Sequence, residues 1–228
     1  MSDEPLVRWD WIADHSDLIW KQFVEHSLLT AIAVGIGLAL SFPLALYAYK
    51  HKRLYGPILG VTGFLYTIPS LALFAFMGAY TGYLSITTAE IGLVSYTLLI
   101  LIRNIVVGLR SVPADARETA RAMGYSDRQL LWKVEIPLAL PAIVAGIRLA
   151  TVTTIGLVTV TAVLGLGGFG YFILDGLRTF FTTVTLLGAV LSVLFATVID
   201  IALIYLGRFA TPWTRRTGTP WTRRARGA

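Results

Sequence analysis

The sequence contains no cysteine and few charged residues. Of its 228 residues, 14% are charged and 56% are hydrophobic, whereas about a quarter of a soluble domain is charged. The absence of cysteine excludes disulfides, thiolate catalysis and cysteine-ligated metal sites. The three histidines, His15, His26 and His51, are far apart in the sequence. We therefore expect no metal site and interpret these histidines as solvated or interfacial.

Charge is also missing from four long stretches of the chain, which are residues 27–49, 54–89, 149–174 and 179–199. Each stretch provides the roughly 20 apolar residues that a membrane-spanning helix needs. The sequence therefore predicts an all-α, polytopic membrane protein. Its five expected spans are residues 27–49, 58–80, 86–109, 141–165 and 184–208. An interfacial segment (1–26), a long loop (110–140) and a basic tail (209–228) complete the chain.

The distribution of lysine and arginine predicts how the chain lies in the membrane. Three segments carry 15 of the 19 Lys and Arg residues: 50–53, 103–140 and the tail from Arg208. Short basic loops stay in the cytoplasm, so five spans place the N-terminus outside and the C-terminus inside. The net charge of +6 is then a topology signal, and we expect no nucleic-acid partner.

The loop between the third and fourth spans has the start and stop signals of two short helices. Pro113 suits the first turn of a helix, and Gly124 suits a left-handed helix end. Ser126 and Gln129 form a capping box that starts the second helix. Pro137 and Pro141 are expected to separate this second helix from the following span. The loop is therefore predicted to be a rigid elbow.

The same loop resembles the cytoplasmic signature loop of ABC importer permeases. That signature reads Glu-Ala-Ala, three residues, Gly, nine residues, Ile, one residue and Leu-Pro. All its spacings are kept here by seven residues, namely Glu118, Thr119, Ala120, Gly124, Val134, Ile136 and Pro137. The resemblance implies a type I, methionine-permease-like fold whose elbow docks on separate ABC ATPase subunits. ATP and Mg would be bound there, so this chain is expected to bind no cofactor and to be no enzyme.

Other segments resemble permeases for osmoprotectants such as glycine betaine, carnitine and choline. They are Thr67–Phe74, Leu101–Asn104, Gln129–Arg148 and Gly165–Gly170. The resemblance implies a bacterial cell-membrane protein that acts in osmotic stress. Its partners would be a second permease copy or a paralogue, an extracytoplasmic solute-binding protein and membrane lipids. The alternatives are an importer of another small solute such as an amino acid, and an ATP-independent channel or carrier.

One glycine-rich segment has the spacing of a dinucleotide-binding motif. Gly165, Gly167 and Gly170 match G-x-G-x-x-G, but that motif requires a preceding strand, and here a span precedes it. We interpret the segment as a flexible turn at the outer mouth. The sequence contains no P-loop motif, which agrees with ATP binding by another subunit.

Four residues are candidates for the solute pathway or its gate: Pro69, Tyr66, Asn104 and Asp200. Pro69 should kink the second span. An acid such as Asp200 inside a span is a functional candidate, although it could also form a structural hydrogen bond. Arg103 and Arg148 are expected to reach the cytoplasmic interface with their long side chains.

The tail repeats a short basic and aromatic pattern, Thr-Pro-Trp-Thr-Arg-Arg, from Thr211 and again from Thr219. Basic residues near an anionic membrane surface are attracted to it. We therefore predict that the repeated pairs anchor the tail to lipid, through Arg215, Arg216, Arg223 and Arg224.

Overall fold

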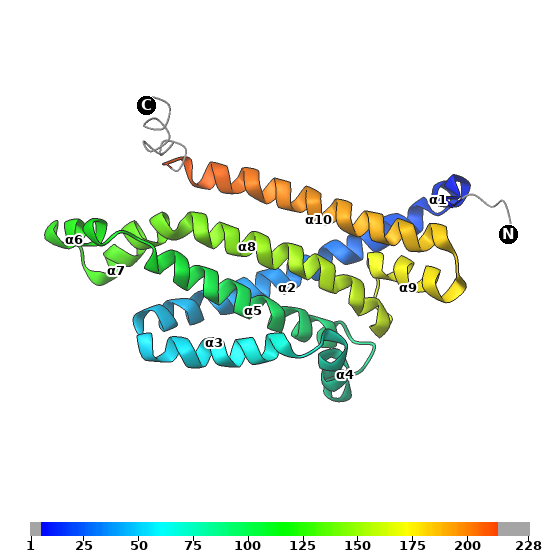
Figure 1. Cartoon of the computed structure of the whole chain (residues 1–228), viewed down its shortest axis with the longest axis horizontal. Coiled ribbons are helices and arrows are strands. Elements are labelled where there is room, and N and C mark those ends of the chain that lie inside the picture. Colours follow the sequence, from blue (N-terminus) through cyan, green and yellow to red (C-terminus); the bar gives the residue numbers. More distant parts are fainter. Residues whose placement is uncertain (1–5, 214–228) are drawn as a thin grey trace, which may run out of the picture.

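The computed structural model describes residues 6–213, and within this range the regular structure is entirely helical. Twelve helical elements follow one another along the chain (Figure 1): α1 (Trp9–Asp14), α2 (Ser16–Lys50), α3 (Lys52–Thr67), α4 (Ser70–Thr81), α5 (Ile86–Arg110), α6 (Ala114–Ala122), α7 (Asp127–Leu130), the π-helical η1 (Leu131–Glu135), α8 (Ile136–Val158), the 3-10 helix η2 (Thr159–Leu164), α9 (Phe169–Thr179) and α10 (Thr182–Ala210). The all-α prediction is confirmed.

Four uninterrupted helical segments are long and apolar enough to cross a membrane: α2, α5, Asp127–Leu164 and α10. A fifth crossing is available if the broken pair α3 and α4 counts as one span. These two helices meet at 96°, and α4 turns away from the long axis of the bundle (Figure 1). The break lies at Ile68 and Pro69, because a residue before proline avoids the helical conformation and Ile68 is extended, with ψ 127°. The predicted kink is confirmed.

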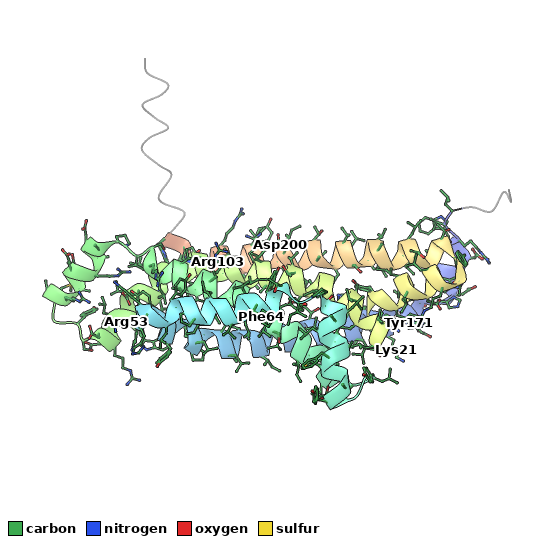
Figure 2. The ribbon with its side chains drawn as sticks, turned by 60° about the horizontal axis from the view of Figure 1, so that its bottom comes forward. Lys21, Arg53, Phe64, Arg103, Tyr171 and Asp200 are labelled. Atoms are coloured by element: carbon green, nitrogen blue, oxygen red, sulfur yellow. The ribbon has the colours of Figure 1, made fainter. Side chains whose placement is uncertain are left out.

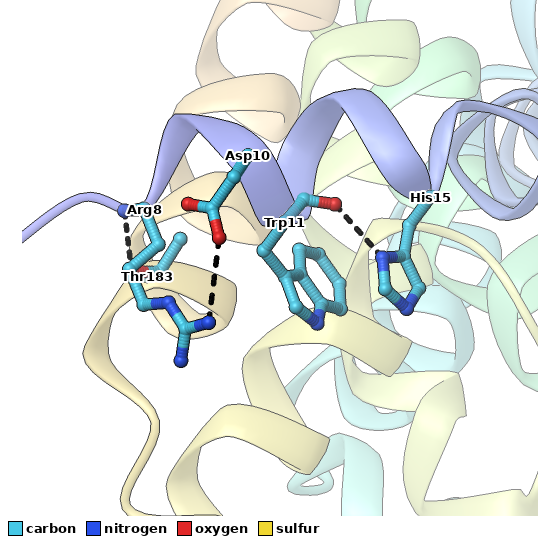
Figure 3. A network of polar contacts seen from close by, with 5 residues as sticks. All are labelled: Arg8, Asp10, Trp11, His15 and Thr183. Atoms are coloured by element: carbon cyan, nitrogen blue, oxygen red, sulfur yellow. Dashed lines mark hydrogen bonds and ion pairs between the residues drawn. The ribbon is translucent and has the colours of Figure 1, made fainter.

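The N-terminal segment is divided between a short helix and the first long one. α1 ends at Asp14, and α2 begins at Ser16 and continues for 35 residues. Figure 3 shows how α1 lies against the start of α10. The backbone N–H of Arg8 donates to Thr183 Oγ1 at 3.1 Å, and the Trp11 ring packs edge-on against Phe181. Residues 16–26, which we assigned to the interfacial segment, are here the first turns of α2.

The centre of the bundle is formed by α2, α5 and α8, which approach one another through small residues. A Cβ atom at Gly37 would lie 1.9 Å from Thr97 Oγ1, and one at Gly146 would lie 2.5 Å from the Asn104 Cβ. Such close approach is how membrane helices gain packing contacts, since the lipid removes the hydrophobic driving force between them. The apolar core around these contacts includes buried Leu101, Ile102, Ile105, Val106, Leu109, Ala139 and Ile143.

The structure gathers the basic segments at one end of the bundle. The turn between α2 and α3, the α6–α7 elbow and the end of α10 all lie at the left in Figure 1, and α1 and α9 lie at the right. The predicted orientation requires this arrangement, because the three basic segments were all assigned to the cytoplasm. The orientation itself stays a prediction.

The orientation can be tested by labelling single cysteines, because the chain has none of its own. We expect a membrane-impermeant thiol reagent to label Leu84→Cys and Thr182→Cys from outside intact cells. Arg53→Cys and Ser126→Cys should be labelled only after the membrane is opened. All four positions are exposed, so burial would not explain a difference. The opposite pattern would reverse the orientation.

The close contact between α2 and α5 predicts different effects of two substitutions on one helix. Gly37→Ala forces Cβ against Thr97, whereas no atom lies within 4 Å of a Cβ at Gly35. We expect Gly37→Ala to lower the free energy of unfolding by about 1–3 kcal/mol, the usual cost of overpacking. Gly35→Ala should leave it unchanged or slightly raised. Thermal unfolding of the purified protein in detergent measures both, and equal stabilities would contradict the proposed packing.

Candidate functional site

The elbow between α5 and α8 is built from two well-defined helix ends. Pro113 precedes α6, and Gly124 follows it with φ 82°. Its N–H donates to the Arg121 carbonyl, and the Tyr125 N–H donates to the Ala120 carbonyl, which is the Schellman arrangement. Ser126 and Gln129 then form the expected capping box at the start of α7. The predicted left-handed corner and capping box are both present.

The seven signature residues are divided between the exposed and packed sides of this elbow. Glu118 and Thr119 on α6, and Gly124 at the corner, are exposed. Ala120 is buried, and Val134, Ile136 and Pro137 are partly buried in η1 and the start of α8. The motif therefore provides an outward surface on α6 and an inward anchor beside the bundle.

One sequence prediction about this elbow is wrong. Pro137 and Pro141 do not separate the second helix from the span, because helical structure continues from Asp127 to Leu164. Proline interrupts a helix by removing one N–H and by crowding the preceding turn. Here Pro137 is the second residue of α8 and lies two residues after a π-helical turn, Leu131–Glu135, whose wider hydrogen-bond spacing accommodates it. The elbow and the span are thus one element.

A buried carboxylate that the sequence reasoning did not select fixes the elbow to the bundle. Glu135 pairs with Arg117 Nε at 3.0 Å, and its Oε1 accepts a hydrogen bond of 2.6 Å from the Tyr49 hydroxyl on α2. Arg117 also donates to the Leu109 carbonyl at the end of α5. Glu135 thus joins α6 to the end of α2, and its partner Arg117 joins α6 to the end of α5. Its position inside the signature, between two apolar residues, was the available signal.

The structure brings together two of the four pathway candidates. Tyr66 at the end of α3 and Asn104 on α5 line one open groove of about 470 Å³. Pro69 lies three residues beyond Tyr66, at the break before α4. Asp200 lies in a different groove, between α8 and α10. The candidates therefore belong to two grooves, of which Leu149 lines both.

Asp200 forms an ion pair with Arg148 that connects α10 to α8. Two hydrogen bonds of 2.9 Å join Arg148 Nε and Nη2 to the two carboxylate oxygens. The expectation that Arg148 reaches for the interface is therefore wrong, because a carboxylate on the neighbouring helix neutralises its charge. Both side chains remain about a third exposed, and a charged pair is costly in hydrocarbon. This face of α8 and α10 is thus better suited to protein or water than to lipid.

A second polar cluster, at the other end of the bundle, fixes the glycine-rich segment in place. The Gly168 N–H donates to Gln22 Oε1 at 2.6 Å, and the Phe169 N–H donates to His26 Nδ1 at 3.1 Å. His26 Nε2 then donates to the Ile155 carbonyl, which requires the neutral tautomer protonated on Nε2. His26 is fully buried. His26 is therefore not solvated as we expected, and hydrogen bonds to Gln22 and His26 hold the segment that we interpreted as a flexible turn.

The described helices fit a known family. The family of binding-protein-dependent transport system inner membrane components matches residues 26–212. The chain belongs to this family. It is therefore a multi-pass membrane component of a transport system, and its long apolar helices agree with this.

Several named proteins are similar to this chain over most of its length. It is 36% identical to the osmoprotectant import permease protein OsmW of Salmonella typhimurium, over 83% of this chain and 90% of that protein. It is 32% identical to the carnitine transport permease protein OpuCD of Listeria monocytogenes over 89% and 91%, and 34% identical to the choline transport system permease protein OpuBB of Bacillus subtilis over 86% and 89%. These relatives are named as permeases. The predicted resemblance is confirmed.

The fold has solved counterparts among ABC transporters. The inward-facing MetNI methionine ABC transporter matches with a TM-score of 0.78 and 21% identity, over 92% of this chain and 100% of that one. An amino acid ABC transporter matches with a TM-score of 0.68 and 16% identity, over 89% and 98%. At these identities the likeness shows the fold alone, and it confirms the type I importer fold.

Two expectations concern ligands and the tail. Within residues 6–213, no three His, Asp or Glu side chains are grouped closely enough to hold a metal ion. The predicted lipid anchors Arg215, Arg216, Arg223 and Arg224 lie outside the described residues.

The Arg148–Asp200 ion pair predicts that removing one charge lowers the stability of the protein more than removing both. Asp200→Ala leaves the Arg148 guanidinium without its carboxylate, so we expect the free energy of unfolding to fall by about 1–3 kcal/mol. The double variant Arg148→Met with Asp200→Leu removes both charges and should be closer to the wild type. Thermal unfolding of the purified variants decides this. A double variant that is less stable than Asp200→Ala would show that each side chain has a separate role.

Proposed function

We propose that this chain is the permease subunit of an ATP-driven importer for compatible solutes of the glycine betaine, carnitine and choline type. The observation that carries the proposal is the elbow: a short exposed helix, α6, joined through a rigid corner to a helix that continues into a span. The solute class is supported by relatives named for osmoprotectants, carnitine and choline at 32–36% identity.

The elbow suits coupling to a separate ATPase subunit for two physical reasons. Its outer surface carries charged Glu118 and the exposed side chain of Met123, so a partner groove could form both polar and apolar contacts. Its inner side is held by the Glu135 cluster to the ends of α2 and α5. A push on α6 would therefore reach several spans together, and ATP with Mg would act on the partner.

The remaining partners follow from the same proposal. A solute-binding protein would deliver the solute at the end that carries α1 and α9. A second permease, either another copy or a paralogue, would complete the pathway beside the Arg148–Asp200 face. We place the complex in the bacterial cell membrane, with no role for nucleic acid.

Transport by the purified complex tests the function and its alternatives. Vesicles containing the permease, its ATPase and its binding protein should accumulate glycine betaine, carnitine or choline only when ATP is supplied. Uptake of an amino acid in place of these solutes would favour the alternative importer. Uptake that is independent of ATP would favour a channel or carrier and would overturn the coupling role of the elbow.

Gly124 gives a sharper test of the elbow. Its φ of 82° is costly for a β-branched residue, on the order of 1–3 kcal/mol, and no neighbouring atom lies near its Cβ position. We expect Gly124→Val to reduce ATP-driven uptake by about tenfold or more, as loss of roughly 1.4 kcal/mol implies. Gly124→Asn is the matched control, because asparagine tolerates this conformation.

The measurements for both Gly124 variants are uptake, membrane insertion and co-purification of the ATPase. A valine variant that inserts normally but loses uptake supports the elbow. Normal uptake and normal co-purification in Gly124→Val would contradict it.

A further inference from the structure

A groove on the α3, α5 and α8 surface combines an aromatic ring with a guanidinium inside the spans. It has a volume of about 470 Å³, and its lining residues are Tyr66, Leu99, Ile100, Arg103, Asn104, Val107 and Leu149. Figure 2 labels Arg103 and Asp200, and Leu149 lines both this groove and the groove beside Asp200. The groove thus adjoins the surface that the Arg148–Asp200 pair makes unsuited to lipid.

Tyr66 lines this groove near the end of α3, where its neighbours hold it. Its ring packs edge-to-face with that of Tyr96, with centroids 5.6 Å apart. The Tyr96 hydroxyl donates to the Ile68 carbonyl at the break between α3 and α4. The Tyr66 side chain is still 38% exposed, so ring surface remains available. Aromatic faces of this kind bind quaternary ammonium groups.

Arg103 on α5 also lines the groove and is exposed. Arg148 pairs with Asp200, Arg117 pairs with Glu135, and Arg110 lies over the Tyr55 ring. Among residues 6–213, the Arg103 guanidinium has neither an ion pair nor a hydrogen bond. A guanidinium without a partner inside a span is costly, and its fork of donors is the geometry that carboxylates bind.

Asn104 lines the same groove and adds a fixed amide to it. Its Nδ2 donates to the Ile100 carbonyl at 2.8 Å, and the close approach of Gly146 leaves its side chain little room to move. The carbonyl oxygen of the amide therefore stays available as an acceptor. Tyr96, beside Tyr66, is seven residues from Arg103, or about 10 Å along α5. The long side chains of Tyr66 and Arg103 can therefore both reach a small molecule that lies between them.

We propose that this Tyr66–Arg103 groove binds the transported solute when it is a zwitterion with a quaternary ammonium group and a carboxylate. The ammonium would lie against Tyr66, and the carboxylate would accept hydrogen bonds from Arg103. A choline-like cation has no carboxylate and would use only the aromatic end. This inference rests on the proposed function, and it adds which residues of this chain distinguish the two solute types.

The test compares glycine betaine with choline in vesicles that hold the complete complex. Arg103→Gln should lower ATP-driven glycine betaine uptake by about tenfold or more, the effect of losing one charged hydrogen-bonded pair. Choline uptake should change by less than about threefold, on the same basis. Arg103→Lys should retain more glycine betaine uptake than Arg103→Gln. Tyr66→Leu should lower uptake of both solutes, and Tyr66→Phe should preserve it.

Two matched controls lie on α3 outside the groove. Phe64→Leu removes an exposed ring two residues from Tyr66, and Arg53→Gln removes an exposed guanidinium at the start of the helix; Figure 2 labels both positions. Neither control should change the ratio of glycine betaine to choline uptake. The ATPase rate of each complex, measured in parallel, shows whether the complex has assembled.

The outcomes separate the groove from the proposed function. Equal loss of both solutes in Arg103→Gln, or no loss of either, overturns the groove while the importer stands. A loss seen only in vesicles with anionic lipid assigns Arg103 to a lipid headgroup and also overturns it. If the wild-type complex carries amino acids and no quaternary ammonium solute, the proposed function fails and the ligand of the groove fails with it.

Discussion

Close approach of α2, α5 and α8 through small residues is the constraint on which the other features of this permease depend. Gly37 fits against Thr97, and Gly146 against Asn104, with no room for an added Cβ atom. In a membrane, such contacts replace the hydrophobic driving force that holds soluble cores together. They fix the spacing and register of the three helices. The grooves and polar clusters lie around this packed centre.

The polar clusters connect the packed centre to both ends of the bundle. Glu135 joins the elbow to the ends of α2 and α5, and His26 joins the glycine-rich segment to α2 and α8. Helical structure continues between these clusters from Asp127 to Leu164. Under the proposed coupling, a displacement of the elbow would be carried along α8 past Arg148, and the Arg148–Asp200 ion pair would link it to α10.

The faces of the bundle differ in what they can contact. Four residues of α10, namely Thr183, Val184, Gly188 and Gly207, are buried, and much of its remaining surface is apolar. That surface can face lipid or another subunit. The Arg148–Asp200 pair and Arg103 require a polar partner or water. The placement of charge, more than the amount of apolar surface, distinguishes the side suited to a pathway.

The sequence by itself determined the features that depend on local chemistry. Uncharged stretches of sufficient length indicated the spans, and Pro69 indicated the break. Gly124 and Ser126 indicated where the first elbow helix ends and the second begins. Each of these signals acts within a few neighbouring residues, through a missing N–H, a left-handed turn or a side-chain cap. The family signature was found as a resemblance, carried by residues of the elbow whose spacings are kept.

Only the tertiary structure decided which distant polar groups meet. Arg148 and Asp200 are 52 residues apart, and His26 and Phe169 are 143 apart, so no local pattern could pair them. The sequence interpretation placed His26 in solvent and described the glycine-rich segment as a flexible turn. Their hydrogen-bond partners come from distant parts of the chain, so no local pattern indicated them. It ended the second elbow helix at Pro137 because proline disfavours a regular α-helix, whereas a π-helical turn and the packing of α8 against α5 keep this one continuous.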